Sequence, residues 1–262
     1  MNIIRIFYIV LLAVLILDGC TKTTLPIQTS PPDAAQKKAT KEESERIHTE
    51  LGAGYYSRGQ YKIALDELQQ TLKINDEYAP AYDVLGLVYM ALNEDKRAEK
   101  NFRRAIELEP QDPNIRNNYG WYLCNRDQFA ESIKQFDIAL SNPLYSTPES
   151  ALTNAGICSL RAHEPKRAKT YFKASLKINP NQAEALTGLA QIDYEEGELA
   201  EARTLIERML EYNQPTAQAL WIGVRVARKQ NDHDTEASYS LLMRNRFPDA
   251  PETQLLLQGK YD

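Results

Sequence analysis

One small residue returns through this chain at an almost constant interval, and that period limits the possible folds more than any other feature. A glycine or another small apolar residue stands at six places: Gly52, Gly86, Gly120, Gly156, Ala190 and Val224. Successive members are 34, 34, 36, 34 and 34 residues apart. Such a period is typical of proteins that stack one supersecondary unit on the next, so a single globular core is not expected.

Each period contains two helical patterns, shown best by residues 79–112. The repeated positions of this copy are Tyr82, Leu85, Gly86, Tyr89, Ala98, Phe102 and Ala105. Spacings of three and four place the first four on one helix face and the last three on a face of a second helix. Pro110 then ends that helix, and these are the positions that define a tetratricopeptide repeat (TPR). We therefore predict an all-α, right-handed superhelical TPR solenoid of six helix-turn-helix repeats.

The copies can be placed along the chain within a predicted domain over residues 42–258. Their approximate bounds are 45–78, 79–112, 113–148, 149–182, 183–216 and 217–251. The third copy carries its extra residues in a loop with two prolines, where irregular backbone is expected. The sixth copy matches the pattern least well, as a terminal copy should, because one of its sides meets water and not a neighbour.

The start of the chain has the pattern of a bacterial export signal. Arg5 precedes an apolar run over residues 6–17. That run is too short to span a bilayer comfortably, which favours a cleaved signal peptide over residues 1–19. The alternative is an uncleaved anchor in the inner membrane.

The residues after the apolar run predict a lipid anchor. Residues 17–20 resemble a lipobox, in which the cysteine becomes the lipidated first residue of the mature protein. Asp18 departs from that pattern, because small or apolar residues are usual at its position. Thr21 after Cys20 is compatible with sorting to the outer membrane. We expect lipidation at Cys20, a location on the periplasmic face of the outer membrane, and a disordered tether over residues 20–41, which are rich in Thr, Pro, Gln and Ser.

Charge and motifs favour a protein-binding scaffold over an enzyme. The formal net charge is −5, and no basic stripe is present to attract phosphates, so we expect no nucleic-acid partner. The three histidines, His48, His163 and His233, fall in different repeats, and no phosphate loop, zinc motif or nucleophile elbow is found. We expect no catalytic residues, metal, cofactor or small-molecule substrate. An enzyme subunit with its own activity is the alternative from another class.

Two further cysteines fall on the first helices of adjacent repeats. Cys124 and Cys158 are 34 residues apart, and equivalent helices of neighbouring TPRs lie side by side. In an oxidising compartment they could form a disulfide, and otherwise they would be two buried thiols.

Two groups of residues are candidates for partner binding. In the third copy, Asn114, Asn117, Trp121 and Asn125 fall at positions that line the concave groove of a TPR array. Asparagine offers a donor and an acceptor to a peptide backbone, and an exposed tryptophan offers an apolar anchor. Trp121 could equally pack on a neighbouring copy. At the open flank of the first copy, Tyr55 and Tyr56 are the second group, unless the preceding segment covers them.

The motif Asn-Asn-Tyr-Gly-Trp-Tyr-Leu-Cys over residues 117–124 is more specific than the repeats themselves. Together with the TPRs, the lipobox and Cys158, it resembles the PilF/PilW family of type IV pilus biogenesis lipoproteins. The resemblance implies an outer-membrane pilotin that localises and helps assemble the type IV pilus secretin, a lipid on Cys20, and a disulfide between Cys124 and Cys158. The alternative function is an envelope TPR lipoprotein that recruits peptidoglycan enzymes.

Overall fold

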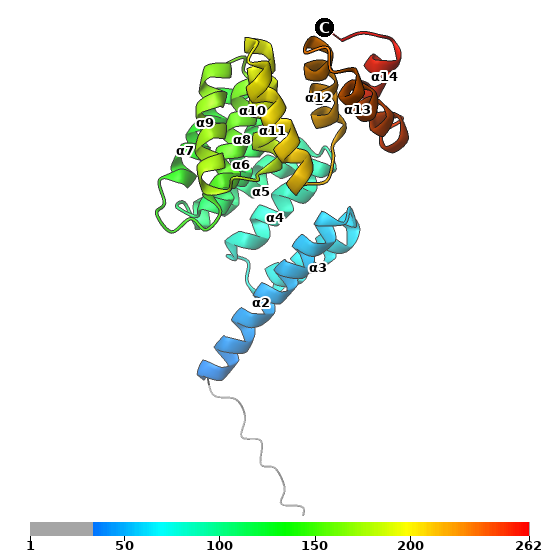
Figure 1. The fold of residues 1–262 in the computed structure, drawn as a ribbon. Coiled ribbons are helices and arrows are strands. Elements are labelled where there is room, and N and C mark those ends of the chain that lie inside the picture. The colour runs from blue at the N-terminus through cyan, green and yellow to red at the C-terminus, as the bar shows by residue number, and fades with distance from the viewer. Residues whose placement is uncertain (1–33, 262) are drawn as a thin grey trace, which may run out of the picture. The chain divides into compact units, whose positions relative to one another are not determined.

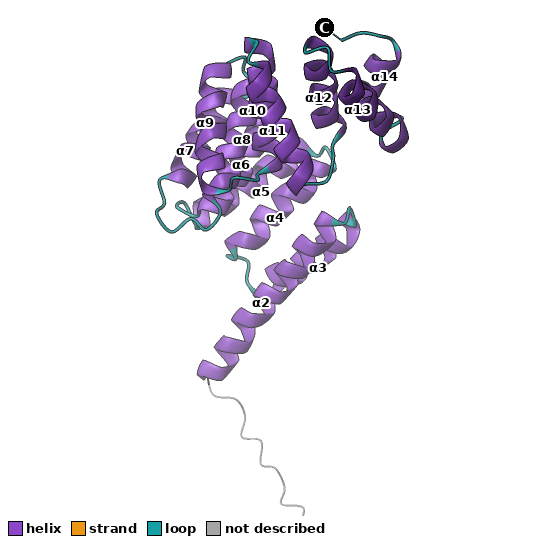
Figure 2. Ribbon diagram, viewed as in Figure 1, coloured by secondary structure: helices purple, strands orange, loops and turns teal. Residues whose placement is uncertain are grey.

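The computed structural model describes residues 34–261, which form helices joined by short turns, with no strand in that part of the chain (Figure 2). The predicted signal peptide, the lipidation site Cys20 and residues 20–33 of the predicted tether lie outside the described residues. The helices are α2 (Ala34–Ser57), α3 (Tyr61–Ile74), α4 (Ala79–Ala91), α5 (Asp95–Leu108), α6 (Pro113–Cys124), α7 (Phe129–Leu140), α8 (Pro148–Arg161), α9 (Pro165–Ile178), α10 (Ala183–Glu196), α11 (Leu199–Tyr212), α12 (Ala217–Lys229), α13 (His233–Arg246) and α14 (Pro251–Leu257), drawn in chain order in Figure 1.

The chain divides within α2 into two compact units, Met1–Glu42 and Glu43–Asp262. In the first unit, the described residues are the beginning of α2. Residues 34–41, expected to belong to the disordered tether, are helical instead. The reason is local: this stretch consists mainly of Ala, Lys and Gln, which favour helix, and it contains neither Pro nor Gly.

The helices of the second unit pack in pairs that follow the repeat. The pairs from α4/α5 to α12/α13 each form a compact hairpin, and the second helix of each pair also packs against the first helix of the next. The first helices of neighbouring pairs also contact one another: α4 with α6, α6 with α8, α8 with α10, and α10 with α12. Among the described residues, successive second helices make no such contacts, so the first helices form the inner layer. This order of packing confirms the predicted all-α TPR solenoid.

A glycine makes the close crossing inside each of the first four pairs. A Cβ atom on Gly86 would lie 2.7 Å from Cδ1 of Phe102, and one on Gly156 would lie 2.5 Å from Cε1 of Phe172. Such separations are too short for real carbon contacts, so the helices could not approach as they do with a larger residue. In the sixth copy, Gly223 faces Tyr239 in this way, one residue before Val224, which the sequence pattern had placed at the crossing.

The turn inside each pair contains one residue in the left-handed region of backbone space. These residues are Gly59, Asn93, Asp127, His163, Gly197 and Asn231, with φ between 56° and 85°. Their spacing is the same as that of the crossing residues, so the turn is a fixed part of the repeat. Gly, Asn and Asp adopt this conformation most readily, which explains the choice of residue at most of these turns.

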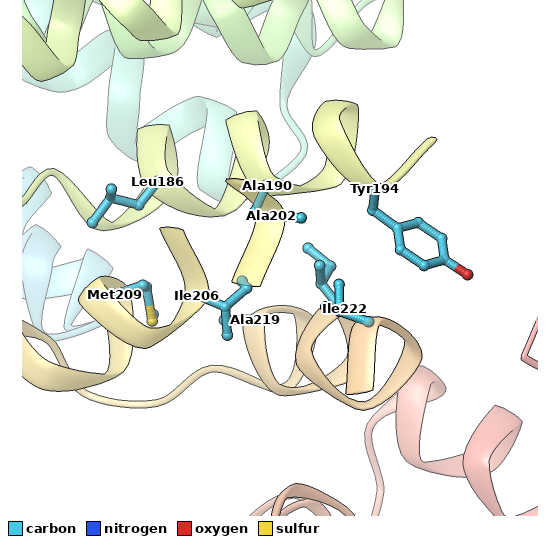
Figure 3. Packing of buried hydrophobic residues seen from close by; sticks show 9 residues of the cluster. Leu186, Ala190, Tyr194, Ala202, Ile206, Met209, Ala219 and Ile222 are labelled. Atoms are coloured by element: carbon cyan, nitrogen blue, oxygen red, sulfur yellow. The ribbon is translucent and has the colours of Figure 1, made fainter. Parts of the chain in front are cut away.

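The core runs between the helices without a single centre. Figure 3 shows Ile206 and Met209 of α11, which are 1% and 0% exposed, between residues of α10 and α12. At the C-terminal end, α14 packs against α12 and α13 and buries Leu256. Because α14 contacts α12 as the earlier first helices contact one another, it acts as the first helix of an incomplete seventh copy.

Candidate protein-binding surfaces

The inner layer carries a ladder of polar side chains across three successive first helices. Asn118 of α6 donates from Nδ2 to Oδ2 of Asp83 on α4 at 2.7 Å. Asn154 of α8 donates from Nδ2 to Oδ1 of Asn117 at 3.0 Å, and Asn117 donates more weakly to Asn118 at 3.4 Å. The amide of Asn117, predicted to face a partner, is therefore engaged with neighbouring helices.

Asp83 ends this ladder as a buried carboxyl group. Its side chain is 6% exposed, and Oδ1 has no hydrogen-bond partner among the described residues. Burial raises the pKa of Asp83 to about 7, the hydrogen bond from Asn118 opposes that rise, and the negative charge of Asp112 adds to it. The carboxyl group is therefore partly protonated at neutral pH.

The other candidates of the third copy, Asn114, Trp121 and Asn125, differ in their surroundings. Trp121 is half-buried and packs against the cluster around Cys124 and Cys158, which is the packing alternative for this residue. Asn125 donates to the backbone oxygen of Trp121 at 3.0 Å and accepts from Arg161 of the next copy at 2.9 Å. Asn114 is exposed at the start of α6. Most of this group therefore stabilises the stacking of copies.

Cys124 and Cys158 lie on α6 and α8, and the structure joins them in a disulfide with Cα atoms 5.7 Å apart. Both residues are fully buried. Ser132 of α7 lies beside the bridge, with Oγ 3.2 Å from Sγ of Cys158, and donates to the backbone oxygen of Gly120 at 2.7 Å. The bridge thus links the third copy to the fourth within the core.

The flank of the first copy exposes apolar residues at places that are buried in the next five copies. Ile47 is 42% exposed, whereas the equivalent residues of the next five copies are 0–2% exposed: Ala81, Ile115, Ala151, Ala185 and Ala219. Leu51 is 41% exposed, whereas its equivalents are buried: Leu85, Tyr119, Ala155, Leu189 and Gly223. We call Ile47 and Leu51 the open flank.

The exposed places are those that a preceding helix pair covers in the later copies. In the second copy, Ala64 and Leu68 of α3 cover Ala81 and Leu85 of α4, and the same contact recurs along the array. No helix precedes α2 in the part of the chain that the structure describes. Within the described residues, the open flank therefore lacks the cover that α3 gives to α4.

Tyr55 and Tyr56, the residues predicted at this end, are half-buried and not fully exposed. Both pack against the cluster formed by Ala64 and Leu68. The sequence pattern pointed to two residues at this end of the array but not to the open flank. Ile47 and Leu51 could have been found by asking which positions a preceding copy would cover.

The described residues contain no group of three or more His, Cys, Asp or Glu side chains placed to hold a metal ion. Nδ1 of His48 lies 2.7 Å from Oε2 of Glu67, His163 is the left-handed turn residue of its copy, and His233 lies 3.8 Å from Glu236. Each histidine therefore has a local structural setting. Within residues 34–261, none of the helices is both long enough and apolar enough to cross a membrane.

Comparisons with known proteins agree with this architecture. Tetratricopeptide repeat models match residues 79–112, 101–134 and 159–221. The type IV pilus assembly protein PilF of Pseudomonas aeruginosa is 30% identical over 214 residues, which cover 82% of this chain and 85% of PilF.

Two solved structures extend the likeness to three dimensions. The structure of P. aeruginosa PilF has a TM-score of 0.76 at 29% identity, covering 84% of this chain and all of that one. The crystal structure of PilW, described as a widely conserved type IV pilus biogenesis factor, has a TM-score of 0.71 at 30% identity, covering 81% of this chain and 98% of that one. From the shared repeats, sequence identity and fold, this chain belongs to the PilF/PilW family of type IV pilus biogenesis TPR proteins.

Proposed function

We propose that this protein is a pilotin: a lipid-anchored outer-membrane scaffold that brings type IV pilus secretin subunits to that membrane and helps them assemble. A lipid on Cys20 fixes the location, the following segment provides reach, and the TPR array binds a segment of the secretin. Family membership and the lipobox pattern at residues 17–20 support this role. Binding and positioning are sufficient for it, so no covalent chemistry is required of the protein.

The observation that carries the binding role is the open flank. Ile47 and Leu51 are exposed where the repeat otherwise buries an apolar side chain under a neighbouring helix. A partner helix with one apolar face would cover them as a preceding copy would, because helices of this array pack through such faces. We therefore place the secretin contact at the first copy, on the same helix that carries Tyr55 and Tyr56.

The test measures secretin in outer-membrane fractions, scored as heat-resistant multimers against monomers. Cells would carry the gene deleted, restored, or restored as Cys20→Ala. Loss of multimers on deletion supports the pilotin role, and loss in the Cys20→Ala strain supports the lipid anchor. Unchanged multimers in all three strains would exclude the role, and recovery of peptidoglycan hydrolases with the protein would then favour the recruitment of cell-wall enzymes.

The binding surface has its own test in the same cells. The double variant Ile47→Glu and Leu51→Glu places charge on the open flank, while Leu241→Glu places it on another exposed leucine, which is 59% exposed on α13. We expect the flank variant to lose multimers at normal protein level and the control to keep them. Equal multimers in both would reject the flank as the contact while leaving the deletion result intact.

A further inference from the structure

The last described residues lie back on the first helix of the sixth copy. After α14, Gly259 has a φ of 67°, and the N–H of Lys260 donates to the backbone oxygen of Leu255 at 3.0 Å, which reverses the chain. The ring of Tyr261 then stacks on Trp221 of α12, with ring centroids 5.7 Å apart and planes inclined by 22°. A short tail thus carries one aromatic side chain onto the inner layer of the array.

Cations surround these rings. The guanidinium carbon of Arg225 is 4.5 Å from the ring centroid of Tyr194 and 5.5 Å from that of Trp221. Lys229 lies 4.3 Å from the Tyr194 centroid, and Arg228 lies 4.0 Å from the centroid of Tyr261. We call this group the C-terminal aromatic site: Tyr194, Trp221, Arg225, Arg228, Lys229 and Tyr261.

The positive charge of this site is only partly balanced. Arg228 pairs with Glu236 at 2.8 Å. Arg225 donates to the neutral amide oxygen of Gln191 at 2.7 Å, and its buried Nε has no hydrogen-bond partner among the described residues. No ion pair to Lys229 is present in residues 34–261. Burial lowers the pKa of the Arg225 guanidinium, and the nearby Tyr194 and Glu195 oppose that shift, although no carboxylate forms an ion pair with Arg225 among the described residues.

The site lies on the face that a TPR array uses for binding. Trp221, Arg225 and Lys229 occupy the fifth, ninth and thirteenth places of the sixth copy, on α12 of the inner layer. The bond between Arg225 and Gln191 spans the contact between α12 and α10. A ligand here would meet aromatic faces and the guanidinium group of Arg225 together.

We propose that the C-terminal aromatic site binds a peptide segment in which an aromatic side chain stands next to an acidic one, and that Tyr261 occupies the aromatic place in the unbound protein. The incoming ring stacks on Trp221, and the carboxylate accepts hydrogen bonds from Arg225 and is attracted to Lys229. This site is at the opposite end of the array from the open flank, so it goes beyond the proposed function and does not depend on it.

Tyr261 is an intramolecular competitor for such a ligand. If the tail covers the site for about nine-tenths of the time, the apparent affinity for the ligand falls about tenfold. Removing the ring should therefore strengthen binding by a similar factor. A site without this competition would show no change.

The experiment measures binding of three blocked tetrapeptides to the full chain by calorimetry or by NMR shifts: acetyl-Gly-Tyr-Asp-Gly-amide, its Tyr-Asn analogue and its Ala-Asp analogue. The protein variants are Tyr261→Ala, and Tyr261→Ala combined with Arg225→Gln or with Lys229→Gln. The matched control combines Tyr261→Ala with Arg244→Gln, which removes an exposed arginine of α13 outside the site. Circular dichroism and the thermal midpoint establish that each variant is folded.

We expect the Tyr261→Ala variant to bind the Tyr-Asp peptide about tenfold more tightly than the unchanged protein. Binding should weaken with either analogue and with either the Arg225→Gln or the Lys229→Gln change, and should be unaffected by Arg244→Gln. The proposal is overturned if Tyr261→Ala binds no peptide, or binds the Tyr-Asp and Tyr-Asn peptides equally. Because Lys229 is exposed, its variant tests the charge requirement even if Arg225→Gln does not fold.

Discussion

The two ends of the array differ in how they cover the side chains of their outermost helix. At the C-terminal end, α14 packs on α12 and α13 and leaves Leu256 only 6% exposed, although Leu255 and Leu257 on the same helix are 36% and 59% exposed. At the N-terminal end, α2 keeps Ile47 and Leu51 42% and 41% exposed, although the same places are buried in the next five copies. A repeat protein needs a cap where it meets water, and the proposed partner contact at the first copy rests on these exposed side chains.

The largest effect we expect comes from breaking the disulfide that joins the N-terminal half of the array to its C-terminal half. Reduction of the bridge between Cys124 and Cys158 should lower the free energy of unfolding by about 3–4 kcal/mol, from the entropy of closing a loop of this size. Urea unfolding with and without reductant measures the change. After alkylation of the unreduced protein, mass measurement should find neither Cys124 nor Cys158 alkylated. Two alkylated cysteines at these positions would rule the bridge out.

Replacing one leucine by alanine at each end compares the stability contribution of a buried side chain with that of an exposed one. Leu256→Ala should lower the free energy of unfolding by about 2–4 kcal/mol, because a buried side chain is lost and a cavity remains. Leu51→Ala should change it by no more than about 0.5 kcal/mol, because its side chain already meets water in the isolated protein. Urea midpoints compare the two. A large loss for Leu51→Ala would mean that the flank is covered within the protein itself.

The half of the array with the open end also contains the buried carboxyl group of Asp83. Its pKa is raised to about 7, above the value in the unfolded chain, so the folded state binds the proton more tightly. The protein should therefore lose stability as pH rises from about 4 to about 7, and lose no more from this group above that range. A rise of about three pKa units corresponds to a loss on the order of 4 kcal/mol across this range.

Asp83→Asn removes that titration and should remain nearly flat over the same range. The gain in stability of the variant over the unchanged protein should be larger at pH 8 than at pH 5, measured by urea unfolding. Asp66→Asn, at an exposed position of α3, serves as the control and should show no such trend. A gain that is equal at both pH values would show that burial does not shift this group.

Glycines near the two ends should respond with opposite signs. A Cβ on Gly223 would lie 2.7 Å from Cδ2 of Tyr239, so Gly223→Ala should destabilise by at least about 1 kcal/mol through overpacking. A Cβ on Gly54 would meet only the tip of Arg58 at 3.7 Å, so Gly54→Ala should stabilise α2 by up to about 1 kcal/mol. Thermal midpoints of the two variants test this. Destabilisation by both would indicate that the first copy is packed as closely as the sixth.

The fold was predictable because the repeat fixes most of it. One period of residues such as Leu85, Gly86 and Phe102 is sufficient to predict the helix pair and its crossing, and five further copies repeat the evidence. The displacement of the sixth crossing to Gly223 was harder to foresee. In that copy, Ser240 stands at the regular position of the large residue that faces the crossing. Tyr239, one residue earlier, faces Gly223 instead, so both partners of the crossing are displaced by one residue.

The candidate surfaces were less predictable, because side-chain pairing between copies depends on register. Asp83 and Asn118 are 35 residues apart, and Asn117 and Asn154 are 37 residues apart. The copies that they join are offset by 34 and 36 residues, so each pair is separated by one period plus one residue. A search for polar residues at that offset would have found the ladder. No comparable signal places Tyr261 on Trp221, because the tail lies beyond the last copy and its path is set by α14 and the turn at Gly259.

The smallest effect we expect comes from changing the turn residue in each of the two end copies. Gly59 and Asn231 occupy the same place of the first and sixth copies, with φ of 71° and 56°. Gly59→Ala should destabilise by about 1 kcal/mol, because a side chain disfavours this conformation even though no atom lies within 4 Å of the added Cβ. Asn231→Gly should stabilise by a few tenths of a kcal/mol, since asparagine already tolerates the left-handed region. Both changes are measurable as shifts of the urea midpoint relative to the unchanged protein.

Opposite signs at the two ends would show that the turn has the same structural role in both copies and that the two ends differ only in how their outermost helices are covered. Equal signs would mean that the turn of the open end is set by different contacts from those of the capped end.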